Sequence, residues 1–313
     1  MRRRPYRLVT TTAALTASMV LLGGCSAQVQ GAAPGASGPH LTVVAPLGTK
    51  APLPEQPPDE PAMTFVGLSE RERLATEQAA AAGADITAAV LDRNTGQLVT
   101  NGNGRTIAIA SVVKLFIADD LLLQVARGET ELSPQDRQSL DVMLRSSDDS
   151  AAEVFWNRSG GSEIVSRVVD RYNLTSTRRP NNGRWFNTTS TVTDLVRYYD
   201  MLLSGAGGLP AQQAAIILDN LAASTPTAPD GMVPGGIYPQ RFGIPEGLPG
   251  ERVAVKQGWM CCVGSDWMHL STGVIGADRR FVMAIGAMQP TDADTARQTI
   301  TDAVRVMFPE GHI

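Results

Sequence analysis

Cysteine is scarce in this chain of 313 residues: after Cys25 there is only the adjacent pair Cys261 and Cys262. So few cysteines exclude a fold that depends on a disulfide framework. Adjacent residues on a straight strand point to opposite faces, so a bond between these two sulfurs would require a bend in the backbone. Two alternatives stay open, a vicinal disulfide or two separate buried thiols.

Histidine is equally scarce, and its three positions are His40, His269 and His312. Three histidines so far apart do not make a zinc-hydrolase cluster, and the sequence predicts neither a metal site nor a cofactor. A serine–histidine–aspartate triad would have His269 as its one candidate base, and no G-x-S-x-G motif accompanies it. If the protein performs acyl chemistry, lysine has to be the base.

Lysine occurs only three times, as Lys50, Lys114 and Lys256, while arginine supplies the other positive charges. The whole chain has 27 basic residues against 31 acidic ones. Removal of the four arginines before residue 25 would leave 23 against 31, a net charge of about −8. This acidic balance excludes nucleic acid as an expected partner.

The N-terminal residues have the pattern of a bacterial lipoprotein signal. Four arginines accompany an apolar run from Leu8 to Leu22, which is too short to cross a bilayer comfortably. The run ends in Leu-Gly-Gly-Cys25, which resembles a lipobox. We therefore expect residues 1–24 to be a signal peptide and Cys25 to carry two or three acyl chains, which would hold the exported protein at the outer face of the cell membrane. An ordinary cleaved signal and an uncleaved anchor are the alternatives.

Two further segments follow the signal. Residues 25–62 are rich in proline, alanine and glycine, which predicts a disordered tether. Residues 63–313 have the length and composition of one large folded domain.

The order of patterns in this domain predicts an α+β fold. Strand patterns near both ends of the domain favour a five-stranded antiparallel sheet flanked by helices, and the helical block between them favours a separate lobe. A cleft between sheet and lobe is the expected place for a site. The expected helices are 68–82, 111–127, 134–145, 163–172, 192–203 and 291–307, and the expected strands are 86–92, 97–100, 253–260, 267–275 and 280–288.

One of the two lysines within the domain lies three residues after a serine, in Ser111-Val-Val-Lys114. Positions three apart share one face of a helix, so the hydroxyl would lie within reach of the amine. The dipole of a helix N-terminus and a second cation could lower the pKa of the lysine enough for it to accept the serine proton. Arginine could not do this, because it does not deprotonate. The structural alternative is a buried helix start with a snorkelling lysine.

Two further motifs are weak when taken alone. Ser147-Asp148-Asp149 follows a predicted helix, and a polar turn with solvated acids explains it equally well. Lys256-Gln257-Gly258 lies on a predicted strand, where Lys256 and Gly258 share a face and offer a cation and space for a substrate backbone.

In the order SxxK, SD[ND] and K[TS]G, these motifs resemble those of class A β-lactamases and D,D-peptidases. Four longer segments extend the resemblance from residue 68 to residue 307, and the signal, tether and domain together resemble an alanine-rich mycobacterial lipoprotein. These segments read SSDDSAAE, GGSEIVSRVVDRYNLTSTR, NTTSTVTDLVRYYDMLL and QRFGIPEGLPGERVAVKQG.

The resemblance implies a role for each motif residue. Ser111 would be the acylated nucleophile, and Lys114 would be the base or its partner. Ser147 would pass a proton to the leaving nitrogen, and Lys256 would bind a substrate carboxylate. The backbone N–H groups of Ser111 and Trp259 would form the oxyanion hole. The substrate-binding positions would be Asp149, Gln257, Gly258 and Trp259.

The sequence also departs from the family's pattern. The family's lactamases deacylate with a glutamate on an Ω-loop, and the corresponding interval, 179–187, is shorter and contains no acid. Glu153 stands where an asparagine normally supports that glutamate; whether it could itself activate a water stays open. Asp149 replaces an asparagine that donates to substrate, and its carboxylate would repel an anion. Only 36 residues separate Ser111 from Ser147, which predicts a reduced lobe.

The matching motifs and the departures from the family's pattern together leave two possible functions. In the first, a lipid-anchored serine hydrolase domain is acylated at Ser111 by a β-lactam or a D-Ala-D-Ala-like peptide of peptidoglycan and releases the product slowly. In the second, the fold is a catalytically inactive binding or scaffold module of the cell wall.

Overall fold

The computed structural model describes residues 62–313. The predicted signal peptide, the lipidation site Cys25 and the tether up to residue 61 lie outside the described residues. Among residues 62–313, no helix is both long and apolar enough to cross a membrane.

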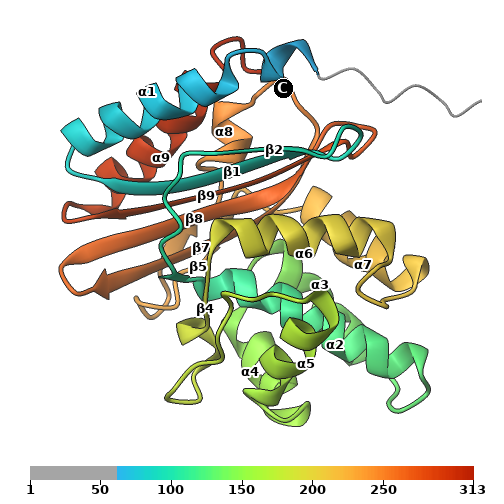
Figure 1. Cartoon of the computed structure of the whole chain (residues 1–313). Helices are drawn as coiled ribbons and strands as arrows, with labels where there is room; N and C mark the ends of the chain where they lie inside the picture. The colour runs from blue at the N-terminus through green and yellow to red at the C-terminus, as the bar shows by residue number, and fades with distance from the viewer. Residues whose placement is uncertain (1–61) are drawn as a thin grey trace, which may run out of the picture. The chain divides into compact units, whose positions relative to one another are not determined.

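A five-stranded sheet forms the centre of the fold (Figure 1). Its order is β2-β1-β9-β8-β7, and every neighbouring pair is antiparallel. Because β1 pairs with β9, the first and last strands along the chain lie side by side and the two ends of the domain complete one sheet. The strands are β1 (Asp85–Asp92), β2 (Gln97–Thr100), β7 (Val253–Val263), β8 (Asp266–Ile275) and β9 (Phe281–Gln289). This confirms the predicted fold class.

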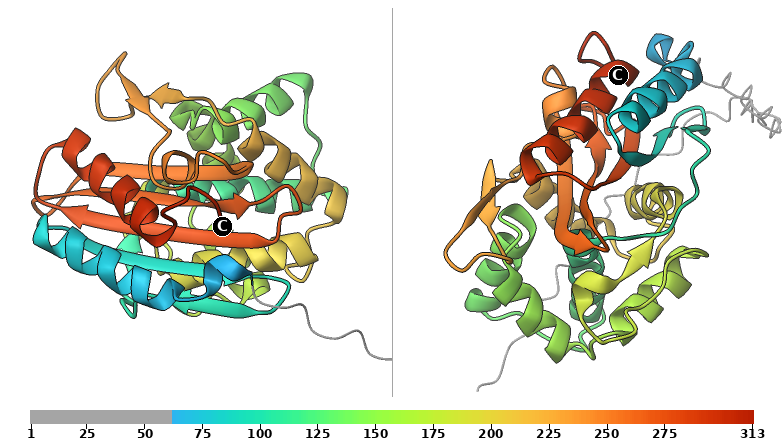
Figure 2. Two further views of the ribbon diagram at one scale, coloured as in Figure 1. Left: turned by 90° about the horizontal axis from the view of Figure 1, so that it is seen from above. Right: turned by 90° about the vertical axis from the view of Figure 1, so that its left-hand side faces the viewer.

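Helices α1 (Leu68–Ala81) and α9 (Ala293–Met307) cover one face of this sheet, where they lie next to each other (Figures 1 and 2). Asp292 begins α9 as its N-cap, because its side chain accepts a hydrogen bond from the Thr295 backbone N–H. Alanine, isoleucine and valine recur four residues apart along α9 and give it one buried face. The short elements on this side are η1 (Met63–Phe65) and α8 (Ile244–Gly247).

The helical lobe packs against the other face of the sheet (Figure 1). Helix α6 contacts the sheet directly, and the remaining helices surround the apolar α2. The lobe helices are α2 (Lys114–Ala126), α3 (Pro134–Arg145), α4 (Asp149–Arg158), α5 (Glu163–Tyr172), α6 (Val192–Ser204) and α7 (Ala211–Ala222). Between or beside them run β3 (Ile107–Ala108), η3 (Trp185–Asn187), β4 (Thr189–Ser190), β5 (Thr227–Pro229) and β6 (Ile237–Pro239).

Two local predictions need correction. The helix predicted from Ser111 begins instead at Lys114, after a 3₁₀ turn, η2 (Ala110–Val113), because Ala110 has a φ of 42° and turns the chain before the helix. Asp148 and Asp149 do not form a mere polar turn. The Asp148 side chain caps α4 by accepting from the Ala151 backbone N–H, so these acids begin a helix that the sequence analysis missed. Helix α7 was also missed.

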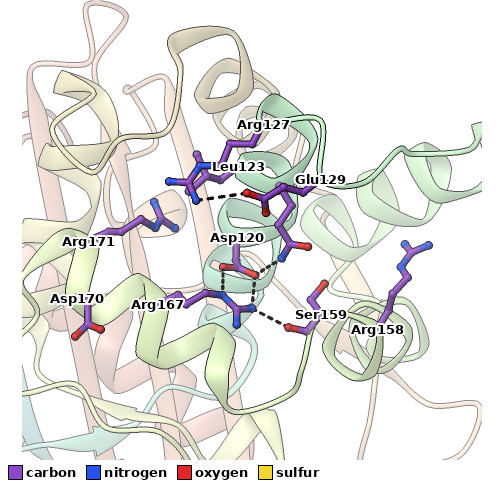
Figure 3. Close-up of a pocket in the computed structure, with 10 residues that line it drawn as sticks. Asp120, Leu123, Arg127, Glu129, Arg158, Ser159, Arg167, Asp170 and Arg171 are labelled. Atoms are coloured by element: carbon purple, nitrogen blue, oxygen red, sulfur yellow. Dashed lines mark hydrogen bonds and ion pairs between the residues drawn. The ribbon is translucent and has the colours of Figure 1, made fainter.

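Buried ion pairs hold the lobe helices together. Asp119 on α2 accepts from Arg171 and from the Tyr172 hydroxyl, both on α5. Its neighbour Asp120 forms a two-pronged pair with Arg167, with both N···O distances 2.7 Å. Figure 3 shows the second pair at the wall of a surface cavity of about 570 Å³.

Candidate active site

Three segments far apart in the sequence meet at one edge of the sheet. The turn η2 and the adjoining start of α2 bring Ser111 and Lys114, the turn before α4 brings Ser147, and β7 brings Lys256. Gly258 allows this approach, since a Cβ there would lie 2.6 Å from the carbonyl oxygen of Ile109. Any side chain at this position would therefore push the strand away from the turn.

Hydrogen bonds connect the four predicted catalytic side chains in a row. The Lys114 amine lies 2.9 Å from Ser111 Oγ and 3.2 Å from Ser147 Oγ. The Lys256 amine lies 2.7 Å from the same Ser147 Oγ. The structure thus brings Ser111, Lys114, Ser147 and Lys256 together in the order that a proton relay requires.

Both lysines are completely buried, and burial is the largest cause that lowers the pKa of each below its usual range. The Lys114 cation lowers the pKa of Lys256 further. Asp149 acts in the opposite direction: its carboxylate lies 2.5 Å from the Lys114 amine and raises the pKa of both lysines. The lowered pKa favours the neutral form of Lys114, which a base requires, and burial is its largest cause.

Backbone strain accompanies this arrangement. Ala110 and Ser147 have φ angles of 42° and 56°, in the left-handed region that residues with a Cβ rarely adopt. Ala110 directly precedes the nucleophile, and Ser147 is the bridging hydroxyl. Strain of this kind persists where the surrounding structure fixes a side chain in a required position.

Ser111 opens into a cleft of about 430 Å³, whereas Lys114, Ser147 and Lys256 are not among the residues that line it. The cleft walls come from η2, η3, the segment between β5 and β6, and the end of β7. Its lining consists of Ala110, Ser111, Asp149, Trp185, Phe186, Asn187, Gly231, Met232, Trp259, Met260, Cys261, Cys262 and Val263.

The four predicted substrate-binding residues are placed differently. Asp149 and Trp259 line the cleft, and Trp259 stacks on Tyr238 with ring centroids 4.7 Å apart. Gly258 lies against the turn that carries the nucleophile. Gln257 is buried, and its amide donates to the carbonyl oxygens of residues 240 and 242 at 3.0 and 2.8 Å, so its side chain supports the loop beside β7 and does not line the cleft.

Trp185 is a residue whose role the sequence analysis missed. Its ring lies 4.8 Å from the Lys114 amine, and its indole N–H donates to Glu153 at 3.0 Å. Glu153 also accepts from the Asn157 amide, so both of its carboxylate oxygens are engaged. Trp185 thus lies over Lys114, in the interval where the family's lactamases carry a deacylating glutamate. The adjacent aromatic residues at 185–186 are the one signal in the sequence that points to this position.

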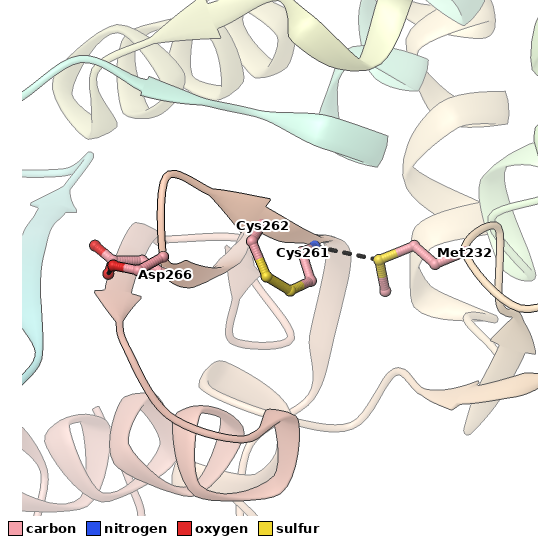
Figure 4. The surroundings of a disulfide bond; sticks show 5 residues. Met232, Cys261, Cys262 and Asp266 are labelled. Carbon is pink, nitrogen blue, oxygen red and sulfur yellow. Dashed lines mark hydrogen bonds between the residues drawn. A yellow bond between two sulfur atoms is a disulfide. The ribbon is translucent and has the colours of Figure 1, made fainter.

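The segment between β5 and β6 forms the opposite rim. Gly231 packs so closely on Asp149 that a Cβ there would collide with the carboxylate. The sulfur of Met232 accepts from the Cys261 backbone N–H at 3.1 Å (Figure 4). Cys261 and Cys262 are joined as a vicinal disulfide, at an irregularity in the β7–β8 pairing between Met260 and Val263. The sequence left open a vicinal disulfide or two separate thiols; the structure has the disulfide, and the backbone is irregular there as the bond requires.

His269 is the histidine that could have served a triad, and it lies elsewhere. It is buried on β8 among aromatic rings, and a 2.6 Å hydrogen bond joins it to the Tyr238 hydroxyl. Burial lowers its pKa to about 3. Within residues 62–313 no group of three or more histidine, cysteine or acidic side chains could hold a metal ion.

Comparisons with known proteins agree with this geometry. No family model matches the chain. It is 55% identical, over an alignment of 322 positions that covers 100% of both chains, to a protein named "Putative lipoprotein LppW" in Mycobacterium bovis and in Mycobacterium tuberculosis.

Solved structures that resemble the chain are class A-type β-lactamases. The β-lactamase from Sphaerobacter thermophilus has a TM-score of 0.62 at 16% identity, over 77% of this chain and 97% of its own. The class A β-lactamase from Mycobacterium abscessus has a TM-score of 0.58 at 21% identity, over 75% of this chain and 98% of its own. At these identities the likeness shows the β-lactamase fold.

Proposed function

Because this chain belongs to the family of the mycobacterial lipoprotein LppW and has the β-lactamase fold, we propose that it is an acyl-serine enzyme of slow turnover. Its nucleophile is Ser111, and its acyl donor is an amide of the β-lactam or D-Ala-D-Ala-like class. The carrying observation is the 2.9 Å contact between the Lys114 amine and Ser111 Oγ, in a row that continues to Ser147 and Lys256.

Acylation needs one proton to travel along this row. Neutral Lys114 accepts the proton of Ser111 as Oγ attacks the carbonyl carbon, and the developing oxyanion faces backbone N–H groups, those of Ser111 and Trp259. Lys114 passes the proton to Ser147, whose own proton goes to the leaving nitrogen as the C–N bond breaks. Lys256 lies 2.7 Å from Ser147 Oγ and stabilises that hydroxyl while it carries negative charge.

Release of the acyl group needs a water molecule with a base beside it, and two features oppose it. The Trp185 ring occupies the space above Lys114. Glu153, the nearest acid on α4 to that ring, uses one oxygen for the Trp185 indole and the other for Asn157. An acyl-enzyme that forms at Ser111 should therefore be long-lived.

We also propose that Cys25 carries the lipid anchor, as the name of the relatives and the lipobox-like sequence suggest. The domain would then work at the outer face of the cell membrane, where peptidoglycan peptides are available. A Cys25→Ala chain should leave the detergent-phase membrane fraction and appear in the soluble fraction; if both chains partition alike, the anchor is elsewhere.

The acylation is tested by intact-mass measurement after exposure of the purified protein to labelled penicillin. We expect one adduct per chain that maps to Ser111 and persists after removal of free label. Ser111→Ala should not be labelled, whereas Ser204→Ala, a matched change of an exposed serine on α6, should be labelled normally. Labelling that survives Ser111→Ala would contradict the assignment of the nucleophile, and rapid hydrolysis of the β-lactam would contradict slow release.

One observation favours the alternative of an inactive binding or scaffold module. The Asp149 carboxylate, 2.5 Å from the Lys114 amine, stabilises the protonated form of that amine, which cannot act as a base. If no penicillin, activated ester or acyl-D-Ala-D-Ala peptide acylates Ser111 at any pH between 5 and 9, this second function is supported.

A further inference from the structure

The cleft above Ser111 has no positively charged lining residue. Among its lining residues there is no lysine, arginine or histidine, and the one charged side chain is the acid Asp149. Residues with aromatic or sulfur-containing side chains make up most of the remaining lining, and the Trp259 ring itself is stacked on Tyr238. They are Trp185, Phe186, Met232, Trp259, Met260, Cys261 and Cys262. Such walls stabilise apolar groups by removing them from water, and they supply no cation to pair with a substrate carboxylate.

The two lysines of the motifs do not supply the missing charge to the cleft surface. Lys114 is 0% and Lys256 is 1% exposed. The Lys256 amine is bonded to Ser147 Oγ, which is itself 2% exposed. A substrate carboxylate in the cleft therefore cannot form a direct ion pair with Lys256 unless Ser147 moves.

Asp149 is held at the cleft wall in a fixed position. One carboxylate oxygen is bonded to Lys114, and the other is packed under Gly231 at the tip of the β5–β6 segment. The side chain is still 46% exposed, so it faces a bound substrate. When Lys114 is neutral, as acylation requires, nothing in the cleft lining balances this negative charge, and an anionic substrate is repelled.

We propose that the acyl donor of Ser111 is uncharged, a neutral ester or amide with an apolar group beside the scissile bond, and that a free carboxylate at that place selects against binding. This inference rests on the proposed acylation of Ser111. The inference changes the preferred acyl donor of that reaction from one that bears a carboxylate to one that is neutral.

When the acyl donor is an ester, water is the only other reactant that the reaction needs. Ser111 Oγ forms a bond to the carbonyl carbon while its proton passes to Lys114, and the bond to the leaving alkoxide breaks. Ser147 protonates that alkoxide to an alcohol and takes the proton of Lys114 in return, which leaves Lys114 neutral again. Water later converts the acyl-serine into a carboxylic acid and free Ser111.

A matched pair of probes tests the charge alone: benzylpenicillin and its methyl ester, which differ by one negative charge at the carboxylate. Acylation rates of the purified protein are measured by intact mass, with Ser111→Ala as the blank. We expect the methyl ester to acylate Ser111 about tenfold faster than the free acid, as one unbalanced charge a few ångströms away predicts. Added salt should reduce the difference.

Two variants locate the source of the selectivity. Asp149→Asn removes the charge and should raise the rate with the acid more than the rate with the ester, so that the ratio falls toward one. Asp219→Asn removes an exposed acid on α7, outside the cleft lining, and should leave the ratio unchanged.

The outcomes separate this inference from the function on which it rests. If both probes acylate Ser111 and the acid is the faster, the acyl-serine function stands and the preference for neutral donors is wrong. If neither probe nor a neutral activated ester such as p-nitrophenyl butyrate acylates Ser111, the proposed function itself fails. An unchanged ratio in Asp149→Asn would show that the selectivity does not come from this carboxylate.

Discussion

The molecule has two clusters of buried charge on the lobe side of the sheet, and they are built differently. In the lobe cluster, Asp119 pairs with Arg171 and Asp120 with Arg167, one acid to each base. In the site cluster, Lys114 and Lys256 share Ser147, and the acid in direct contact with Lys114, Asp149, is 46% exposed. The lobe cluster has one negative charge for each positive charge, whereas the two amines of the site cluster have little negative charge near them.

The difference in charge balance suits the lobe cluster to a structural role and the site cluster to proton transfer. In the lobe cluster each acid has its own guanidinium, and the pairs fix α2 and α5 relative to one another, although burial still raises the pKa of Asp119. An under-compensated pair of amines has lowered pKa values, so a neutral amine that can accept a proton is easier to form, which an acyl-transfer site needs. Arginine in the lobe cluster and lysine in the site cluster fit these two uses, because arginine stays protonated.

The largest effect is expected from Lys114→Met, which removes the base and keeps the volume of the side chain. Acylation of Ser111 should slow by about 10³- to 10⁴-fold, because the hydroxyl loses its proton acceptor. Stability should change little or rise, since a buried amine is replaced by an apolar group. The paired measurements are the acylation rate by intact mass and thermal unfolding. A Lys114→Met variant that unfolds at lower temperature and keeps its acylation rate would show that Lys114 stabilises the fold, as the ion pairs of the lobe cluster do, and does not act as a base.

Asp119→Ala should have the opposite signature. It leaves the Arg171 guanidinium, 17% exposed, and the Tyr172 hydroxyl without their buried acceptor. Breaking such a pair costs about 3–5 kcal/mol, which would lower the Tm by about 10 °C in a domain of this size. Acylation per folded molecule, measured well below the Tm, should be unchanged. The exposed pair Arg305–Asp302 gives the control, because Asp302→Ala should cost about 1 kcal/mol or less.

The sequence predicted the sheet and the row of catalytic side chains for physical reasons. Apolar strand patterns at both ends of the domain could be satisfied in one antiparallel sheet, and lysine at only two domain positions made Lys114 and Lys256 informative. What it did not predict depends on contacts between distant segments. The left-handed Ala110 that delays the helix, the Glu153–Trp185 hydrogen bond and the packing of Gly231 on Asp149 each need the tertiary structure to be known.

Asp149→Asn sharpens the comparison by removing the acid that is in direct contact with Lys114. The Asp149 carboxylate raises the pKa of Lys114 against the larger, opposite effect of burial. Without it the pKa of Lys114 falls further, so a larger fraction of the amine is neutral at a given pH. The rising limb of the acylation rate against pH should therefore move to lower pH, by an effect smaller than the loss in Lys114→Met. A pH profile measured with the neutral methyl ester isolates this effect from substrate repulsion. A limb that moves to higher pH would contradict the proposed direction of the coupling.

The smallest effect is expected at Trp185, which excludes water from the site cluster without belonging to it. Trp185→Ala should open space above Lys114 and hasten release of the acyl group from Ser111 by about two- to tenfold, since access of water is only part of the deacylation barrier. Trp185→Phe keeps most of the ring but cannot donate to Glu153, so it separates the space that the indole fills from the hydrogen bond that positions it. Release is followed by the decay of the penicilloyl mass after free label is removed. If Trp185→Phe releases as fast as Trp185→Ala, the hydrogen bond to Glu153 matters more than the filled space; if neither variant releases faster than the original chain, slow release depends on the missing base alone.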